Sequence, residues 1–83
     1  MILNIEGTRY DARDIVRYES DPQNFTSIIF KSLNSPVIIA CKTKECASAV
    51  INIIDNMFCS EAKFTSIFVD NIIEQSKKSE NDF

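Results

Sequence analysis

The sequence contains no histidine and a single glycine among its 83 residues. Without histidine the chain lacks the commonest general base, the base of Ser-His and Cys-His nucleophile pairs, and the commonest metal ligand. One glycine cannot supply a glycine-rich phosphate-binding loop. The carboxylates are scattered along a chain too short to enclose them in a deep cleft. We therefore expect no enzymatic activity and no cofactor.

Long apolar runs are also missing. No stretch approaches the roughly 20 apolar residues that a membrane-spanning helix requires. The N-terminal residues 1–6 have no basic region, and their apolar run is too short for a secretory signal peptide. A cytoplasmic location is expected, in the host cytoplasm if the protein is virus-encoded.

Cysteine is scarce and odd in number, with Cys41, Cys46 and Cys59 inside or beside apolar stretches. This usage suits a reducing compartment better than a disulfide scaffold. Structural zinc takes four ligands, commonly with a Cys-x2-Cys knuckle, which this spacing does not offer. We expect core thiols and no metal site, with Cys59 the most accessible and a redox thiol as the alternative.

The chain has no net positive charge to attract a nucleic acid. Its formal net charge is −3 and its pI is near 4.8. Nucleic-acid-binding proteins usually carry clustered lysine and arginine, so this balance argues against direct nucleic-acid binding.

One basic grouping stands out, formed by Arg9, Arg13 and Arg17 interleaved with Tyr10 and Tyr18. The tyrosines could stack on bases or on guanidinium groups of a partner. Neighbouring carboxylates predict a solvated, weakly ion-paired face instead, and they belong to Glu6, Asp11, Asp14 and Glu19. A protein interface and a nucleotide or phosphate site are the two alternatives.

The first half of the chain predicts short antiparallel strands. A β-hairpin is expected around Glu6-Gly7, because glycine accepts positive φ without steric cost. The turn at 33–36 joins two runs rich in β-branched residues and predicts a second hairpin. The predicted strands are residues 2–5, 8–11, 15–18, 25–32 and 37–42.

Residues 43–58 predict a long amphipathic helix, with its apolar and polar side chains on separate arcs and no glycine or proline. Thr43 is the expected N-cap, and Glu45 lies near the positive end of the helix dipole. The apolar arc covers more than half of the helical wheel, which is wider than packing on one sheet requires. Either the C-terminal segment or a partner must cover the excess.

Residues 60–77 fit two interpretations. Ser60 and Glu61 look like a helix start, whereas the alternation of Thr65, Ile67 and Val69 is typical of a strand. We favour a second helix. The domain is expected to span residues 1–76, followed by a polar, frayed tail at 77–83.

The sequence thus predicts an α+β fold, with one small antiparallel sheet of four or five strands, a long amphipathic helix and a second C-terminal helix on one face. The expected function is that of a small acidic protein-binding module, an inhibitor or adaptor of another protein. A virus-encoded inhibitor of host nucleic-acid machinery is one form, since an acidic face can occupy a basic channel. The predicted interface residues are Ile51, Ile54, Phe58, Phe64 and Phe68.

Two alternatives accompany this hypothesis. One is an oligomeric binder of a nucleotide or small anion, held at a subunit junction by Arg9, Arg13 or Arg17. The other is a purely structural homo-oligomer. A homodimer with twofold symmetry is the expected assembly, because burying more apolar surface would stabilise so small a core.

Overall fold

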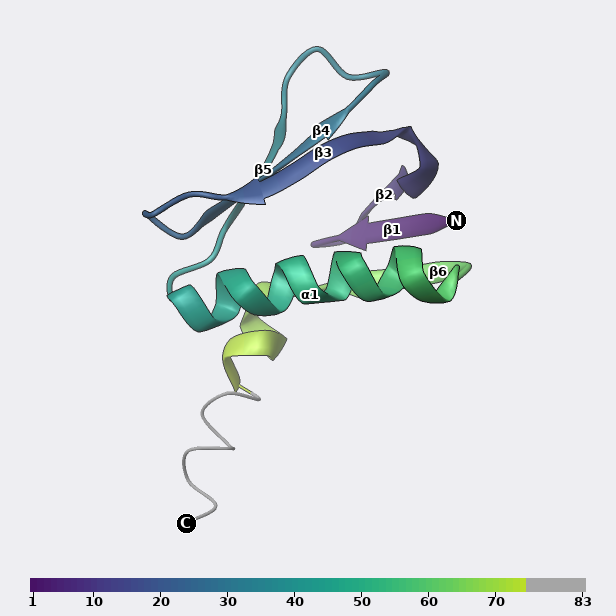
Figure 1. Cartoon of the computed structure of the whole chain (residues 1–83). Helices are drawn as coiled ribbons and strands as arrows, with labels where there is room; N and C mark the ends of the chain where they lie inside the picture. The colour runs from purple at the N-terminus through teal and green to yellow at the C-terminus, as the bar shows by residue number, and fades with distance from the viewer. Residues whose placement is uncertain (75–83) are drawn as a thin grey trace.

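Two three-stranded sheets and one long helix surround the core of the computed structural model, which describes residues 1–74 (Figure 1). Sheet A has the strand order β2-β1-β6 and sheet B the order β3-β4-β5. The helix is α1 (Lys44–Ser60), and a 3-10 turn η1 (Ala12–Asp14) joins the sheets. The strands are β1 (Ile2–Ile5), β2 (Thr8–Asp11), β3 (Ile15–Ser20), β4 (Phe25–Phe30), β5 (Val37–Ala40) and β6 (Phe64–Ile67).

The hairpin of β1 and β2 is confirmed. Ile5 pairs with Thr8, which leaves Glu6 and Gly7 as a two-residue loop with φ of 51° and 92°. Two successive positive φ values define a type I′ turn, whose twist matches that of the flanking strands. The single glycine of the chain therefore stands where positive φ is required.

The antiparallel order β3-β4-β5 confirms the second hairpin and places the third predicted strand beside it. The connection from β3 to β4 is held by Asp21, whose carboxylate accepts hydrogen bonds from the N–H groups of Gln23 (2.9 Å) and Phe25 (3.0 Å). Asn24 follows with φ of 68°, a value that asparagine tolerates better than most residues. Side-chain and backbone turn chemistry together fix this loop.

The long helix is confirmed with its cap. The hydroxyl of Thr43 accepts a hydrogen bond from the N–H of Cys46 at 3.1 Å. At the other end Glu61 adopts the left-handed conformation (φ 54°), and the N–H of Ala62 donates to the carbonyl of Met57. This C-terminal cap stops α1 after Ser60.

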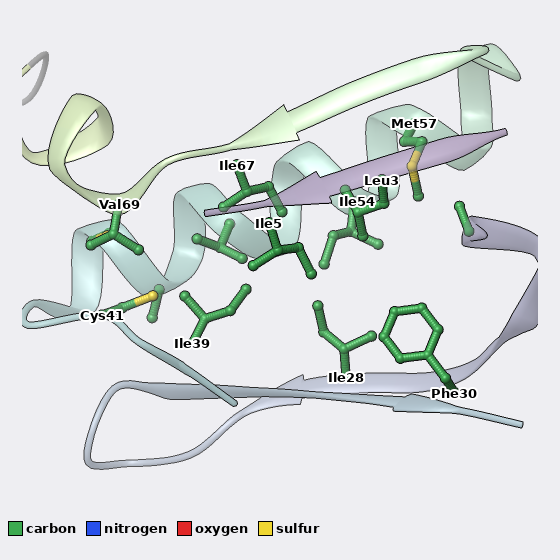
Figure 2. Packing of buried hydrophobic residues seen from close by; sticks show 14 residues of the cluster. Leu3, Ile5, Ile28, Phe30, Ile39, Cys41, Ile54, Met57, Ile67 and Val69 are labelled. Carbon is green, nitrogen blue, oxygen red and sulfur yellow. The ribbon is translucent and has the colours of Figure 1, made fainter. Parts of the chain in front are cut away.

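The core lies between α1 and both sheets, as Figure 2 shows. The helix α1 contacts β6 of sheet A and β3 and β4 of sheet B, which buries Val50, Ile54 and Met57 of its apolar arc and leaves Ile51 and Phe58 half-buried. The side chains with no solvent exposure come from sheet A, sheet B and α1, and they include Leu3, Ile28, Val50, Ile54 and Ile67.

Two predictions are wrong. The strands form two sheets instead of one, and residues 64–67 form β6, parallel to β1, instead of part of a helix. The left-handed Glu61 prevents the helix from continuing, and pairing with β1 overrides the helical stripe.

A short second helix begins only after β6, at residue 69, and is described to residue 74. The carboxylate of Glu6 accepts the N–H of Val69 at 2.7 Å, so a residue of the first hairpin turn supplies a hydrogen bond to the helix start. The predicted tail at 77–83 and its Phe83 lie outside the described residues.

Candidate functional site

The three arginines of the predicted basic grouping belong to three different elements. Arg9 is on the outer side of β2, Arg13 in η1 and Arg17 on the outer side of β3. Arg13 pairs with Asp11 and Arg17 with Glu19, each at 3.6 Å and in exposed positions. Such surface pairs contribute little to stability. The fold does not bring the arginines together, since Arg9 and Arg17 lie on different sheets.

The two tyrosines of this grouping pack inside the molecule. Tyr10 is half-buried and stacks on Phe30 of sheet B, with ring centroids 4.8 Å apart. The ring of Tyr18 stacks on that of Phe58 in α1, with centroids 6.0 Å apart. Both rings hold elements of the fold together, and their faces are engaged by other aromatic rings.

Tyr18 also hydrogen bonds to α1 through its hydroxyl, which donates to Oδ1 of Asp55 at 2.5 Å. This hydrogen bond is the main cause of a raised pKa, and partial burial and the negative charge of Asp55 add to it. Together they raise the pKa of Tyr18 from 10.0 to about 12.

Replacing Tyr18 with phenylalanine is expected to lower the free energy of unfolding by about 1 kcal/mol at neutral pH, since the hydrogen bond is lost and the stack stays. The folded-state pKa is raised, so the contribution is complete below pH 10 and is lost as the pH rises towards about 12. Urea unfolding at neutral pH and through this alkaline range measures it. A difference between wild type and variant that stays constant with pH contradicts the assignment, and Asp55→Asn is the matched control.

The predicted apolar interface divides between core and surface. Ile54 has no exposed area and belongs to the core, so it cannot contact a partner in this fold. Ile51 and Phe58 are half-buried on α1. Phe64 and Phe68 are exposed, to 51% and 36% of their surface.

The exposed Phe64 belongs to the outer face of sheet A. Leu3 and Ile5 of β1 point into the core, so the alternation of the strand places the side chains between and before them outside. The register then aligns neighbours from β2 and β6 on the same side. We call these six residues the sheet A face: Ile2, Asn4, Arg9, Asp11, Phe64 and Ser66.

Arg9 and Phe64 meet across the sheet A face. The guanidinium carbon of Arg9 lies 5.7 Å from the centroid of the Phe64 ring, although β1 separates their strands. This distance fits a cation–π contact. Among residues 1–74, Arg9 has no carboxylate as an ion-pair partner, unlike Arg13 and Arg17. The face therefore presents a guanidinium without an ion-pair partner on an exposed aromatic ring, while the carboxylate of Asp11 on the same face is paired with Arg13.

Asn4 occupies the middle of the sheet A face between Arg9 and Ser66. Its side chain is nine-tenths buried, and its amide nitrogen lies 3.5 Å from the hydroxyl oxygen of Ser66. Its carbonyl oxygen Oδ1 is buried and has no hydrogen-bond partner among residues 1–74. An unpaired buried acceptor costs free energy, so a donor that reached this oxygen would be favoured.

The sheet A face presents an alkyl side chain, an aromatic ring, a guanidinium, a carboxylate, an amide and a hydroxyl. Residues 1–74 contain no group of three or more His, Cys, Asp or Glu side chains that could hold a metal ion. The face can bind apolar groups and hydrogen-bonding or anionic groups together.

The thiols are placed as the sequence predicts. Cys41 and Cys46 are buried and Cys59 is exposed. Burial, followed by the neighbouring Cys41, raises the pKa of Cys46 to about 11. A thiol held protonated in this way is a poor nucleophile, which fits a packing role.

Sequence reasoning missed Ile2, Asn4 and Ser66. The signal that could have indicated part of this face was the alternation of side chains in residues 64–67. If these residues form a strand, Phe64 and Ser66 lie on the same side of it. Even then the partner strand could not be named, because β1 is more than sixty positions away along the chain.

Comparisons with known proteins give no assignment: no protein-family model, no curated protein and no solved structure matches the chain. In the part of the chain that the structure describes, no helix has both the length and the apolar character needed to cross a membrane. The candidate site therefore rests on the geometry of the sheet A face.

Proposed function

We propose that the chain is a non-enzymatic binding module that inhibits or adapts another protein through the sheet A face. The observation that carries the proposal is the exposed pair Ile2 and Phe64, side by side in register, with an arginine that has no carboxylate partner among residues 1–74. The expected partner surface is apolar and carries a carboxylate.

Each group has a defined part in this proposal. Phe64 and Ile2 supply apolar area that a partner removes from water, and aromatic residues and arginine are enriched at interfaces. A guanidinium is weakly hydrated and can bind a carboxylate through two parallel hydrogen bonds. Arg9 could keep its stack on Phe64 while it binds the carboxylate. The buried Oδ1 of Asn4 would gain from a donor on the partner.

A narrower form names the partner as host nucleic-acid machinery with a basic surface and the chain as a virus-encoded protein; it relies on the net charge of the chain and not on a carboxylate bound by Arg9. The net charge of −3 supports it, since an acidic protein is steered towards a basic one. A cytoplasmic site of action accompanies the proposal, because free thiols fit a reducing compartment.

The test compares variants with a substitution on the sheet A face with a control variant that has a substitution on sheet B. Tagged wild-type protein, Arg9→Glu and Phe64→Ser are used to capture proteins from a host lysate, and the captured protein is then purified for titration. Both changes are expected to weaken the Kd about 30-fold or more, the size of an interface hot spot. Val16→Ser, at a 66% exposed residue of sheet B, is the matched control and should bind like wild type.

Three results contradict the proposal. Equal affinity of Phe64→Ser and wild type would show that binding occurs elsewhere, provided the melting curves show both to be folded. An equal loss in Val16→Ser would show that the effect is not specific to sheet A. Retention of no protein at all contradicts the function itself.

The contact of Arg9 with Phe64 also favours a second candidate, a nucleotide bound by stacking and charge. Of the three arginines that the sequence offers for such a site, this candidate uses Arg9. A melting temperature raised by members of a nucleotide panel in wild type, and not in Arg9→Glu, would favour this candidate over protein binding.

A further inference from the structure

In the described part of the chain, the strand β5 forms one edge of sheet B and pairs with β4 on one side only. The N–H of Cys41 donates to the carbonyl of Asn24 at 2.9 Å. In an antiparallel ladder this bonding alternates along the strand, so Val37 and Ile39 also direct their backbone groups to β4. The N–H and C=O groups of Ile38 and Ala40 therefore face the open edge.

Within β5 this edge has no charge, proline or bulge, three of the features that usually protect a strand from pairing with another chain, although the strand has only four residues and Pro36 and Lys42 flank it. No residue of β5 is charged, and Ile38 is 52% exposed. The opposite edge, β3, has a bulge at Val16, the charged pair Arg17–Glu19 and contacts with α1. In sheet A, the edge strand β2 carries charges and the edge strand β6 contacts α1.

We propose that two copies of the chain pair antiparallel through β5, so that both copies of sheet B join into one continuous sheet. The twofold axis passes beside Ile39, which faces the partner's Ile39. The N–H and C=O groups of Ile38 bond to those of the partner's Ala40, and the reverse. All edge groups of both strands are then satisfied by backbone hydrogen bonds.

The sequence of β5 favours a second copy as the occupant. This register places the large Ile38 beside the small Ala40 of the partner, and the twofold axis repeats the pair on the same side of the sheet. Lys42 falls beside the partner's Pro36, so no like charges oppose each other. A register with Ile38 opposite the partner's Ile38 would set Ala40 against the partner's Pro36, which has no N–H to donate.

The dimer goes beyond the proposed function and uses none of the residues of the sheet A face. It would present two such faces in one assembly, which raises avidity for a repeated partner surface. Because the two surfaces share no residue, loss of the dimer and loss of partner binding are separate results.

The test is the mass of the full chain over a concentration series, by sedimentation or light scattering. The wild type is expected to rise from 9.4 kDa to twice this mass. Ile38→Lys and Ala40→Glu are each expected to weaken the dimer about tenfold or more. The double variant is expected to recover it, because each new lysine lies opposite a glutamate of the partner copy.

The recovery in the double variant is specific to this register, since two surface charges would otherwise only increase solubility. Val16→Lys is the matched control and should leave the mass unchanged. If the charged variants do not fold, Ile38→Thr, which keeps a β-branched strand former, is expected to weaken the dimer several-fold. A monomer at all concentrations, or a dimer that Ile38→Lys and Ile38→Thr leave intact, overturns the proposal.

Discussion

Replacing Ile54 with alanine is expected to lower the free energy of unfolding by about 3 kcal/mol, in the range for a large aliphatic side chain removed from a packed core. Ile54 has no exposed area, and Figure 2 shows it beside Leu3 where α1 meets the strands. For a chain of 83 residues the total is about 4–12 kcal/mol, so this loss is a large fraction.

The matched control is Ile51→Ala, the same chemical change one turn earlier at a half-buried position. Its expected cost is below about 1.5 kcal/mol, because less apolar area leaves water at that position. Urea unfolding followed by circular dichroism measures both, and equal slopes show that the unfolded states are comparable. If the two changes cost the same, α1 does not pack between the sheets as described.

Local signals sufficed for the hairpin turn and for the helix. Glu6-Gly7 marks a type I′ turn and Thr43 caps a helix through contacts within a few positions. Neither signal depends on the remainder of the fold. The helical wheel correctly indicated that the apolar arc of α1 is too wide for one sheet. It could not indicate that two sheets pack against this arc, because a wheel describes a single helix.

The sequence left the choice between strand and helix at β6 open for a physical reason. The word FTSI occurs at 25–28 in β4 and at 64–67 in β6, and in the second place a helical stripe competes with it. Two features decide that residues 64–67 form a strand. One is the open edge of β1, more than sixty positions away, and the other is the left-handed Glu61 that ends α1. Parallel pairing over such a separation leaves no local pattern.

Because residues 64–67 were predicted to be helical, the sheet A face was not predicted as a site. Arg9 and Phe64 were both named from the sequence, but in separate groups, one on a strand and the other on a helix. Only the register of β2, β1 and β6 places the guanidinium over the ring. Grouping residues by spacing along the chain joined Arg9 to Arg13 and Arg17, which the fold separates.

Proline substitution at Thr65 is expected to cost about 3 kcal/mol or more, or to prevent folding, because it removes a donor of the sheet ladder. The N–H of Ile2 donates to the carbonyl of Lys63 and that of Glu6 to the carbonyl of Ile67. This alternation directs the backbone groups of Thr65 to β1 and those of Ser66 to the free edge. Proline at an edge position whose N–H is free is tolerated.

Ser66→Pro is therefore the matched control, with an expected cost of about 1 kcal/mol from the imposed φ and the lost Asn4 contact. A helix through 60–77 predicts something different, since proline at either neighbouring position would break a helix equally. The ratio of the two losses, measured by urea unfolding, thus separates strand from helix. Equal losses contradict β6, and with it the side-by-side placement of Ile2 and Phe64 on which the proposed binding face depends.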